Sequence, residues 1–394
     1  MMDKAIEKAP ALVLEYTDAE EGFRGWLVRD TLEHLVCAGG MRVQIGLTRE
    51  RLAAMARNMT RKMRISGLRV DGAKCGIDYD PAAPGKHAAM ARFMAAILPY
   101  VKSCYSMGPD LNVAMAELDA IGRGLGLASV KMAVARAQGW DLVYFNSRYG
   151  ILKQEVDGWP LGRLRIGYGV AVAALATLDH LGIAYPRASV AVQGFGALAR
   201  AALHGLACKG IRVVAVADAE KCIIAESGQG LDIAALLRTG GTLLPAAIPG
   251  GRARIAAREE IYHVPCDILL PAAVERTITE AVAQLLRVRA VVPGANLAVT
   301  EAAEALLSRA GVLVLPDFLT GCGGSLAMDG LFGPQEHPTP AQVLAHVEQR
   351  MTALVRQTLA RSRADQVSPT VAALRICAET VPQPGARPYG AILD

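Results

Sequence analysis

The sequence predicts an α/β protein of two domains, one of which is built on a doubly wound parallel sheet. Its 394 residues are more than a single hydrophobic core usually organises. Residues 188–315 alternate short apolar runs with helical segments, a pattern typical of parallel strands joined by helices. Within them, residues 188–218 are expected to form a strand, a glycine-rich turn, a helix and a second strand.

The glycine-rich turn has the form of a dinucleotide-binding fingerprint. Gly194 permits a tight turn, Gly196 lets the backbone approach a pyrophosphate, and the helix that follows directs N–H groups at the phosphates. Asp218, 22 residues beyond Gly196 (218 − 196), is placed to accept hydrogen bonds from the adenosine ribose. That carboxylate favours NAD, and the nearby Arg212 and Lys221 leave NADP possible. The expected cofactor contacts in this segment are Gly194, Phe195, Gly196, Ala197, Leu198 and Asp218.

Composition excludes several classes of function. The net charge of +5 includes no basic block interleaved with aromatic residues, so nucleic acid is not an expected partner. We find no run of eighteen or more uncharged apolar residues, and therefore expect no membrane span. The charged N-terminus lacks the apolar core of a signal peptide, which makes a cytoplasmic location the expectation. The eight cysteines include no CxxC pair, so neither a metal site nor a disulfide framework is expected.

The N-terminal part offers a second cluster of chemistry-bearing residues. Residues 11–18 and 21–30 are expected to form an edge strand and its neighbour, and the pair Gly39-Gly40 leads into another short strand. A helix is expected to begin after Thr48 and to end in a basic cluster that includes Lys62. Lys74 follows between small residues, where an amine could be held against a substrate.

The stretch around Lys74 resembles the active-site signature of the glutamate/leucine/phenylalanine/valine dehydrogenase family. The matching pattern is Leu68-x-x-x-Gly72-Ala73-Lys74-x-Gly76-x-x-x-Asp80-Pro81, with Lys62 twelve residues before Lys74. Other stretches that agree in order and spacing are Gly108-Pro109-Asp110, the 193–196 turn, 266–273, Gly294-Ala295-Asn296, 315–317 and Gly323-Gly324. The resemblance covers roughly residues 30–380.

The resemblance implies the family's two-domain fold. Residues 1–160, completed by 335–394, would form a mixed-sheet domain for substrate binding and oligomerisation, and 161–334 would form the Rossmann-type NAD-binding domain. It adds Ala272, Ala273, Gly294 and Asn296 to the expected cofactor contacts. Relatives form dimers to octamers, so a homo-oligomer is expected.

The family's reaction is the reversible oxidative deamination of an α-amino acid to a 2-oxo acid and ammonia. The resemblance implies that Lys62 binds the substrate carboxylate and that Lys74 polarises the carbonyl or activates water. Aligned without gaps from Gly108-Pro109-Asp110, the family's catalytic aspartate falls on Glu117. A slip of two residues would substitute Asp119, and Glu117 could also be a solvated helix carboxylate.

The positions that set specificity in this family depart from the glutamate pattern. Ala38 precedes Gly39-Gly40 where glutamate-specific relatives have a lysine, and Met328 stands where they have a serine. A buried glutamate side chain would lack its partners there, so an apolar or atypical substrate is expected. Asp71 replaces the first glycine of the usual GGAK, where it could pair with a substrate amine.

Further departures keep two other interpretations open. Ile166 stands where a threonine beside the nicotinamide is usual, Pro293 where a glutamate precedes GAN, and Gly321 where an asparagine is usual. The leading interpretation is an amino-acid dehydrogenase acting on a substrate other than glutamate. The alternatives are a specialised imine or keto-acid reductase of a biosynthetic pathway, and a non-catalytic paralogue.

Overall fold

The computed structural model describes residues 9–226, 229–247, 252–333 and 337–390, and divides into two compact units. Unit 1 comprises residues 1–149, 332–334 and 380–394, and unit 2 comprises 150–331 and 335–379. We expected all of 335–394 to complete the first domain. Residues 337–379 instead belong to unit 2, and only the segment from 380 returns to unit 1.

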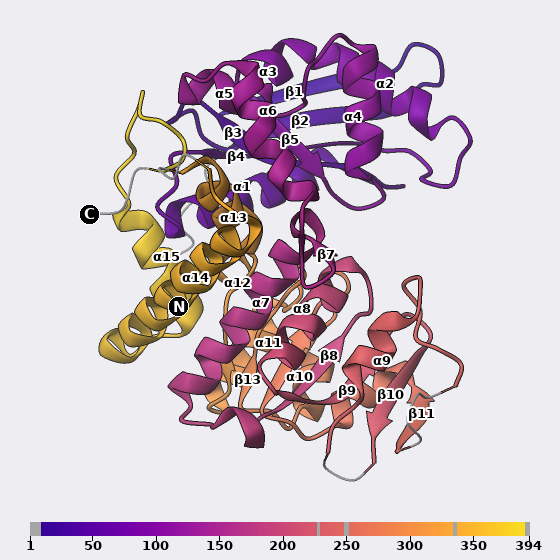
Figure 1. Cartoon of the computed structure of the whole chain (residues 1–394), viewed down its shortest axis with the longest axis vertical. Helices are drawn as coiled ribbons and strands as arrows, with labels where there is room; N and C mark the ends of the chain where they lie inside the picture. The colour runs from indigo at the N-terminus through magenta and orange to yellow at the C-terminus, as the bar shows by residue number, and fades with distance from the viewer. Residues whose placement is uncertain (1–8, 227–228, 248–251, 334–336, 391–394) are drawn as a thin grey trace. The chain divides into compact units, whose positions relative to one another are not determined.

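Unit 1 is built on the expected mixed sheet, with strand order β1-β2-β4-β3-β5 (Figure 1). The antiparallel pairs are β1 with β2 and β2 with β4, whereas β3 runs parallel to both β4 and β5. The expected edge strand and its neighbour are therefore confirmed as β1 and β2. The strands are β1 (Leu12–Thr17), β2 (Arg24–Arg29), β3 (Cys37–Val43), β4 (Asp71–Ile77) and β5 (Tyr105–Pro109).

Helices cover both faces of this sheet. Helix α1 (Arg49–Ile65), capped by Thr48 as expected, packs Leu52 and Ala56 against Trp26 and Val28 of β2. The opposite face carries the larger core, to which α2, α3 and α4 contribute apolar side chains. The helices of unit 1 on that side are α2 (Lys86–Ala96), α3 (Leu98–Ser103), α4 (Met115–Gly124), α5 (Met132–Gln138) and α6 (Leu142–Gly150).

Unit 2 is built on a seven-stranded sheet of order β11-β10-β9-β8-β12-β13-β14 (Figure 1). The five neighbouring strands β9, β8, β12, β13 and β14 are parallel, as the alternation of strands and helices predicts. The antiparallel strands β10 and β11 at the edge were not expected from the sequence. The strands are β8 (Ser189–Gln193), β9 (Arg212–Ala217), β10 (Lys221–Ala225), β11 (Ala253–Ala257), β12 (Ile268–Pro271), β13 (Ala290–Val291) and β14 (Leu313–Val314).

The long helices of unit 2 pack on one another through small residues. A methyl group at Gly167 of α7 (Leu161–His180) would meet the backbone of α8 (Ala197–Cys208), which explains the close contact of these helices. Helix α7 is long and apolar enough to cross a membrane, but 72% of its most apolar window is buried inside the protein, as in a core helix. The remaining helices are α9 (Ile233–Arg238), α10 (Glu280–Leu285), α11 (Glu301–Arg309), α12 (Asp317–Thr320), α13 (Gly323–Phe332), α14 (Pro340–Asp365) and α15 (Pro369–Glu379).

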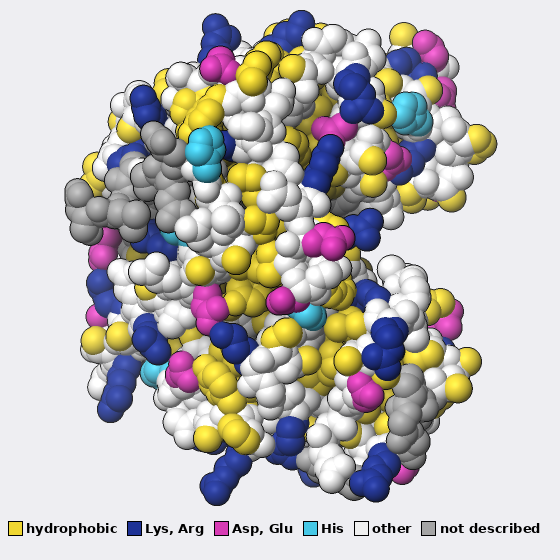
Figure 2. All heavy atoms as spheres, viewed as in Figure 1, with side chains coloured by type: hydrophobic (Ala, Val, Ile, Leu, Met, Phe, Trp, Pro, Cys, Tyr) yellow, Lys and Arg dark blue, Asp and Glu magenta, His cyan; other side chains and the backbone are white. Residues whose placement is uncertain are grey.

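Over the face shown in Figure 2, basic and acidic side chains are interspersed, and yellow apolar side chains lie between them.

Candidate active site

On β4, glycines flank Lys74 on the face of the sheet toward which it points. Because side chains alternate along a strand, Ala73, Cys75 and Ile77 of β4 enter the larger core, and Gly72 and Lys74 point to the other side, toward α1. A methyl group at Gly72 would overlap backbone atoms of α1. We call the side that carries Gly72 and Lys74 the site face.

Lys74 forms an ion pair with Asp110, which follows the last residue of β5. Both side chains are largely buried, with 6% of the Lys74 side chain and 14% of the Asp110 side chain exposed. Arg42 of β3 approaches the same carboxylate, with 3.4 Å between its Nη2 and Asp110 Oδ1. One acid therefore sits between two cations, and the sequence analysis assigned a role to neither Asp110 nor Arg42.

A glycine of β3 makes this ion pair possible. In the sheet, β3 lies between β4 and β5, and neighbouring strands are about 4.8 Å apart, so Lys74 and Asp110 must reach each other across β3. Gly40 pairs with Gly108 of β5, and a methyl group at Gly40 would lie 2.9 Å from the Asp110 Cβ. Gly39 is equally constrained, since its methyl group would overlap the Ala73 carbonyl oxygen. The glycine pair thus serves the approach of neighbouring strands.

The surroundings of Asp110 keep it ionised. Burial by itself would raise its pKa, but the charges of Lys74 and Arg42 outweigh that effect and hold the pKa at about 2. The hydrogen bond from Lys74 and the Leu111 N–H lower it further. At neutral pH the carboxylate is therefore charged and paired.

Glu117, the expected catalytic carboxylate, is paired elsewhere. Its Oε1 accepts from Lys86 Nζ at 2.8 Å, and its Oε2 accepts from the Ala114 N–H at 2.7 Å, which caps the start of α4. Burial raises its pKa, but the bonds from Lys86 and Ala114 outweigh this and leave the pKa below its usual value. The structure thus gives Lys74 a different carboxylate from the one that the alignment indicated.

Asp71 does not have the surroundings that pairing with a substrate amine requires. Its side chain is fully buried, and its position three residues before Lys74 turns it to the opposite face of the sheet. Arg29 donates to Oδ2 at 2.6 Å, and Thr31 and the His34 ring contact Oδ1 at 2.8 and 2.9 Å. We therefore correct this expectation: Asp71 is a structural carboxylate that ties the segment after β2 to β4.

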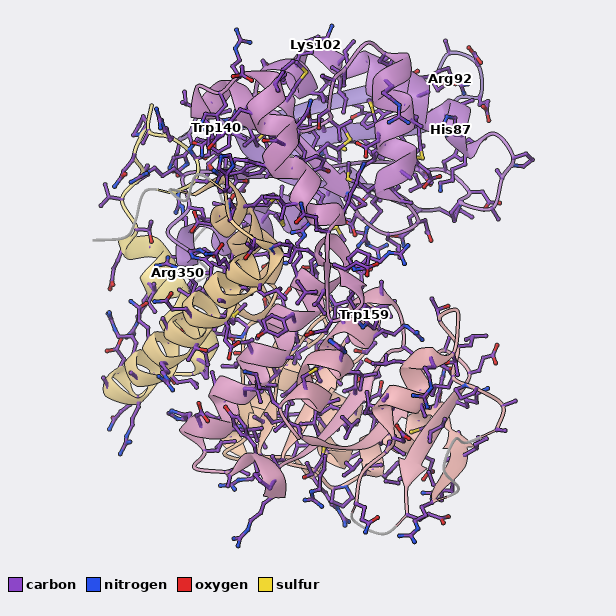
Figure 3. The ribbon with its side chains drawn as sticks, viewed as in Figure 1. His87, Arg92, Lys102, Trp140, Trp159 and Arg350 are labelled. Atoms are coloured by element: carbon purple, nitrogen blue, oxygen red, sulfur yellow. The ribbon has the colours of Figure 1, made fainter. Side chains whose placement is uncertain are left out.

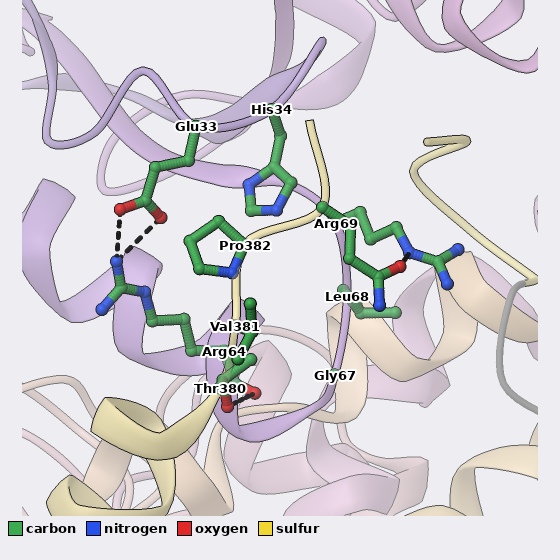
Figure 4. Close-up of a pocket in the computed structure, with 10 residues that line it drawn as sticks. Glu33, His34, Arg64, Gly67, Leu68, Arg69, Thr380, Val381 and Pro382 are labelled. Atoms are coloured by element: carbon green, nitrogen blue, oxygen red, sulfur yellow. Dashed lines mark hydrogen bonds and ion pairs between the residues drawn. The ribbon is translucent and has the colours of Figure 1, made fainter. Parts of the chain in front are cut away.

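A pocket of about 180 Å³ lies beside this cluster, where the C-terminal segment crosses unit 1 (Figure 4). Arg64 holds both carboxylate oxygens of Glu33 at 2.7 Å, and Thr380 donates to the Arg64 carbonyl. The residues that line the pocket include neither Lys62 nor Lys74. The pocket thus belongs to a structural junction.

Three further residues of unit 1 are relevant to substrate binding. Lys62 is 8% exposed and lies in a buried stripe of α1 with Met55 and Asn58. Ala38 pairs with Gly72 and with Ser106, so the row of the sheet beside it is uncharged. Lys131 was not expected, and its ammonium donates to the Met107 carbonyl at 2.9 Å beside Gly108.

The glycine-rich turn of unit 2 has the geometry of a phosphate cradle. Gly194 has φ = 124°, and a methyl group on it would meet the Ala272 carbonyl oxygen at 2.8 Å, so glycine is required. A methyl group on Gly196 would meet nothing within 4 Å. No side chain caps the N-terminus of α8 among the residues that the structure describes. Free space above unsatisfied N–H groups is what a dinucleotide pyrophosphate requires.

Most of the other expected cofactor residues surround this turn. A methyl group on Gly294 would contact Leu198 at 2.8 Å and Ala272 at 3.3 Å, and Ala273 N lies near the Cβ position of Gly194. Phe195, in contrast, is buried beneath the Arg200 guanidinium, 4.7 Å from its ring, so its backbone is the part that could meet a ligand. Ala197 begins α8, and Asn296 follows Gly294 in the loop after β13.

Asp218 lies at the end of β9, where the fingerprint requires an acid. Its Oδ1 accepts from the N–H groups of Glu220 and Lys221, both at 2.8 Å, and its Oδ2 accepts from the Leu244 N–H. A carboxylate has about four acceptor positions, so these bonds leave capacity for a ribose hydroxyl. Met328, the expected specificity residue of unit 2, lies on α13 and is 8% exposed.

Comparison with known proteins gives consistent matches over both units. Residues 163–383 match the model of the glutamate/leucine/phenylalanine/valine dehydrogenase family, and residues 11–124 match that of its dimerisation domain. Glutamate dehydrogenase of Thermotoga maritima is 31% identical over 316 residues, which cover 77% of this chain and 71% of that protein. NAD-specific glutamate dehydrogenase of Clostridioides difficile is 29% identical over 303 residues, covering 73% of this chain and 66% of that protein.

Solved structures agree with these matches. The Leu-bound form of hetero-hexameric glutamate dehydrogenase from Thermus thermophilus superposes with a TM-score of 0.76 at 25% identity, covering 94% of this chain and 88% of that one. Glutamate dehydrogenase from Peptoniphilus asaccharolyticus has a TM-score of 0.68 at 22% identity, covering 94% of this chain and 90% of that one, and supports the fold alone.

The mixed-sheet unit and the Rossmann-type unit with its glycine turn define an NAD(P)-dependent oxidoreductase of the amino-acid dehydrogenase type. The chain belongs to the glutamate/leucine/phenylalanine/valine dehydrogenase family.

Proposed function

We propose that this protein interconverts an α-amino acid with a 2-oxo acid and ammonia, using a nicotinamide dinucleotide. The observation that supports this most directly is the buried Lys74–Asp110 ion pair on the site face, where Gly40 leaves room for it. Deamination moves a hydride from Cα to the nicotinamide and then hydrolyses the imine. It therefore needs a fixed cation near the carbonyl carbon and a base that can exchange protons with water and amine.

Three residues take the roles in this proposal. Lys62 pairs with the substrate α-carboxylate, and Lys74 polarises the carbonyl or imine. Asp110, and not Glu117, exchanges protons, because Asp110 contacts Lys74 and Glu117 is already bound by Lys86 and Ala114. When a substrate draws Lys74 away, Asp110 is left buried with a weaker counter-charge, which makes it a stronger base.

The proposed substrate has an uncharged side chain. The row that contains Ala38 consists of small, uncharged residues, and Met328 is apolar, so neither position offers a cation for a second carboxylate. A buried carboxylate without a partner is disfavoured. Lys131 is the cation beside Gly108 that could contradict this proposal. A strong preference for 2-oxoglutarate that is lost in Lys131→Met would show that Lys131 supplies the missing charge.

NAD is the proposed cofactor, with NADP as the alternative. Asp218 would accept hydrogen bonds from the ribose, and the turn at Gly194, Phe195 and Gly196 with the start of α8 would hold the pyrophosphate. Ala272, Ala273, Gly294 and Asn296 would border the nicotinamide side. The cofactor supplies the hydride acceptor, and the protein supplies its orientation.

A homo-oligomer in the cytoplasm is proposed as the working form. The match of residues 11–124 to a dimerisation domain supports assembly, and light scattering after size exclusion would test it.

The decisive experiment measures NADH and NADPH oxidation with ammonia and a panel of 2-oxo acids, from small aliphatic to branched, aromatic and acidic. Turnover of an uncharged class, lost in Asp110→Asn and retained in Glu117→Gln, is the expected result. Loss in Glu117→Gln with retention in Asp110→Asn would overturn the assignment of the base. Reduction of a preformed imine without ammonia would favour the specialised reductase instead. Cofactor binding without any turnover would favour a non-catalytic paralogue.

A further inference from the structure

A tight hairpin near the start of unit 2 fixes the position of one carboxylate. Strands β6 (Glu155–Val156) and β7 (Trp159–Pro160) pair antiparallel. The two residues that connect them, Asp157 and Gly158, have φ values of 52° and 75°. Two consecutive positive φ values with the sequence Asp-Gly are typical of a type I′ turn, which matches the twist of the flanking strands. The Asp157 side chain therefore projects from a well-defined turn.

Two further ligand-type side chains lie on the last turns of α8. His204 and Cys208 are four residues apart and share one face of the helix. The Cys208 Sγ is 3.6 Å from the His204 Nε2. The ring of Trp159, labelled in Figure 3, lies 5.4 Å from the His204 ring and packs the hairpin on the helix. One ligand atom from each of Asp157, His204 and Cys208 lies within 4.8 Å of the other two.

The separation of the sulfur and nitrogen atoms fits a tetrahedral metal ion. With Zn–S of about 2.3 Å and Zn–N of about 2.0–2.1 Å, a tetrahedral angle places sulfur and nitrogen about 3.6 Å apart. The measured separation of Cys208 Sγ and His204 Nε2 is 3.6 Å. A thiolate, an imidazole and a carboxylate together are a donor set suited to Zn²⁺.

The cation next to the cluster in sequence is engaged by another carboxylate. The ammonium of Lys209, the residue after Cys208, is paired with Glu348 at 2.8 Å. A second cluster with potential ligand atoms among the described residues, Glu33, His34 and Asp71, differs in this respect. Its two carboxylates are already held by Arg64 and Arg29, whose charges would oppose a cation.

We propose that Asp157, His204 and Cys208 form a binding site for a Zn²⁺-type divalent cation, with the fourth coordination position open to water. The ion would join the β6–β7 turn to the C-terminal end of α8. That end is about 16 Å from the helix N-terminus where the cofactor phosphates are expected, because a helix rises about 1.5 Å per residue. The site would thus be separate from the cofactor site.

The sequence predicted no metal site because no two cysteines have ligand spacing. The donors instead come from a turn and a helix that are 47 residues apart along the chain (204 − 157).

The test is a titration of the full-length, chelator-treated protein with Zn²⁺, followed by competition with a chromophoric chelator, and a parallel titration with Co²⁺. We expect one ion per chain and, for Co²⁺, a thiolate-to-metal charge-transfer band with the visible spectrum of tetrahedral coordination. Cys208→Ser should abolish that band. Each of Cys208→Ser, His204→Gln and Asp157→Asn should weaken Zn²⁺ binding about tenfold or more.

Matched controls are Cys104→Ser, which removes a half-buried thiol, and His180→Gln, which removes an exposed imidazole. Both should bind Zn²⁺ as the parent does. Because Asp157 is exposed in a turn that asparagine also tolerates, Asp157→Asn is expected to fold even if a helix variant does not. Absence of saturable binding by the parent would overturn the proposal, and so would parental Zn²⁺ affinity in both Asp157→Asn and Cys208→Ser.

Discussion

The Gly40→Ala variant tests how the Lys74–Asp110 pair is assembled. The new methyl group would lie 2.8 Å from the Pro109 carbonyl oxygen and 2.9 Å from the Asp110 Cβ, where ordinary contact begins at 3.4 Å. The segment that carries Asp110 must therefore move by about 0.5 Å, and a misplacement of about 1 Å costs roughly 10²-fold in rate. We expect kcat/KM to fall between about tenfold and 10²-fold, which is about 1.4–2.7 kcal/mol of transition-state stabilisation.

The assay is reductive amination of the best 2-oxo acid from the panel, together with the free energy of unfolding, which overpacking should lower by about 1–3 kcal/mol. Gly108→Ala is the matched control. It is the β5 partner of Gly40, and its methyl group would meet nothing closer than 3.7 Å. Cofactor affinity should be unchanged in both variants, because the dinucleotide turn belongs to unit 2. A Gly40→Ala enzyme with parental kcat/KM would refute the reasoning.

Three further predictions concern single carboxylates. Asp71→Asn should lower the free energy of unfolding by about 3 kcal/mol or more, because it leaves the mostly buried Arg29 without its counter-charge, as denaturant titration would show. Asp218→Asn should raise the ratio of NADPH to NADH efficiency, measured as kcat/KM with each cofactor, by removing the charge that repels a 2′-phosphate. Because the folded pKa of Asp110 is about 2, below the unfolded value of about 3.9, the parent should lose about 2 kcal/mol relative to Asp110→Asn as pH falls from about 4 to about 2. An unchanged difference between the two proteins across that window would contradict the ion pair.

The parts of the fold that depend on residues close together in the sequence were predictable from the sequence. The glycine turn at Gly194 and the strand that ends before Asp218 are encoded within thirty residues, and the structure has both as expected. The edge strands β10 and β11 were missed because their pairing is set by tertiary contacts. Residues 337–379 were assigned to the wrong unit because the packing of α14 on α7 is equally invisible in local patterns.

The residues of the candidate site likewise divide into those that the local sequence predicts and those that only tertiary contacts determine. Lys74 was identified because the motif around it, and its spacing from Lys62, are contiguous in sequence and resemble the family's signature. Its partner Asp110 was not assigned a role, because the ungapped alignment from Gly108-Pro109-Asp110 favoured Glu117. The register of β3 with β5 decides which acid reaches Lys74, and that register is not visible in the sequence. A signal was present: Asp110 directly follows a strand that pairs with the Gly39-Gly40 strand. Asp71 misled for the converse reason, since proximity in sequence to Lys74 does not place two side chains on one face of a strand.

The pH dependence of the reaction should report the separation of Lys74 from Asp110. In the free enzyme the pKa of Asp110 is about 2, so kcat/KM, which reflects the free enzyme, should show no acid limb from this residue while the protein remains folded. In the proposed substrate complex Lys74 would be directed to the carbonyl, and burial would then raise the pKa of Asp110 with less charge to oppose it. The kcat profile should therefore have an acid limb at higher pH than kcat/KM, and Glu117→Gln should leave that limb in place. Coincident limbs in the two profiles would mean that the pair stays closed during turnover and that another group exchanges the proton.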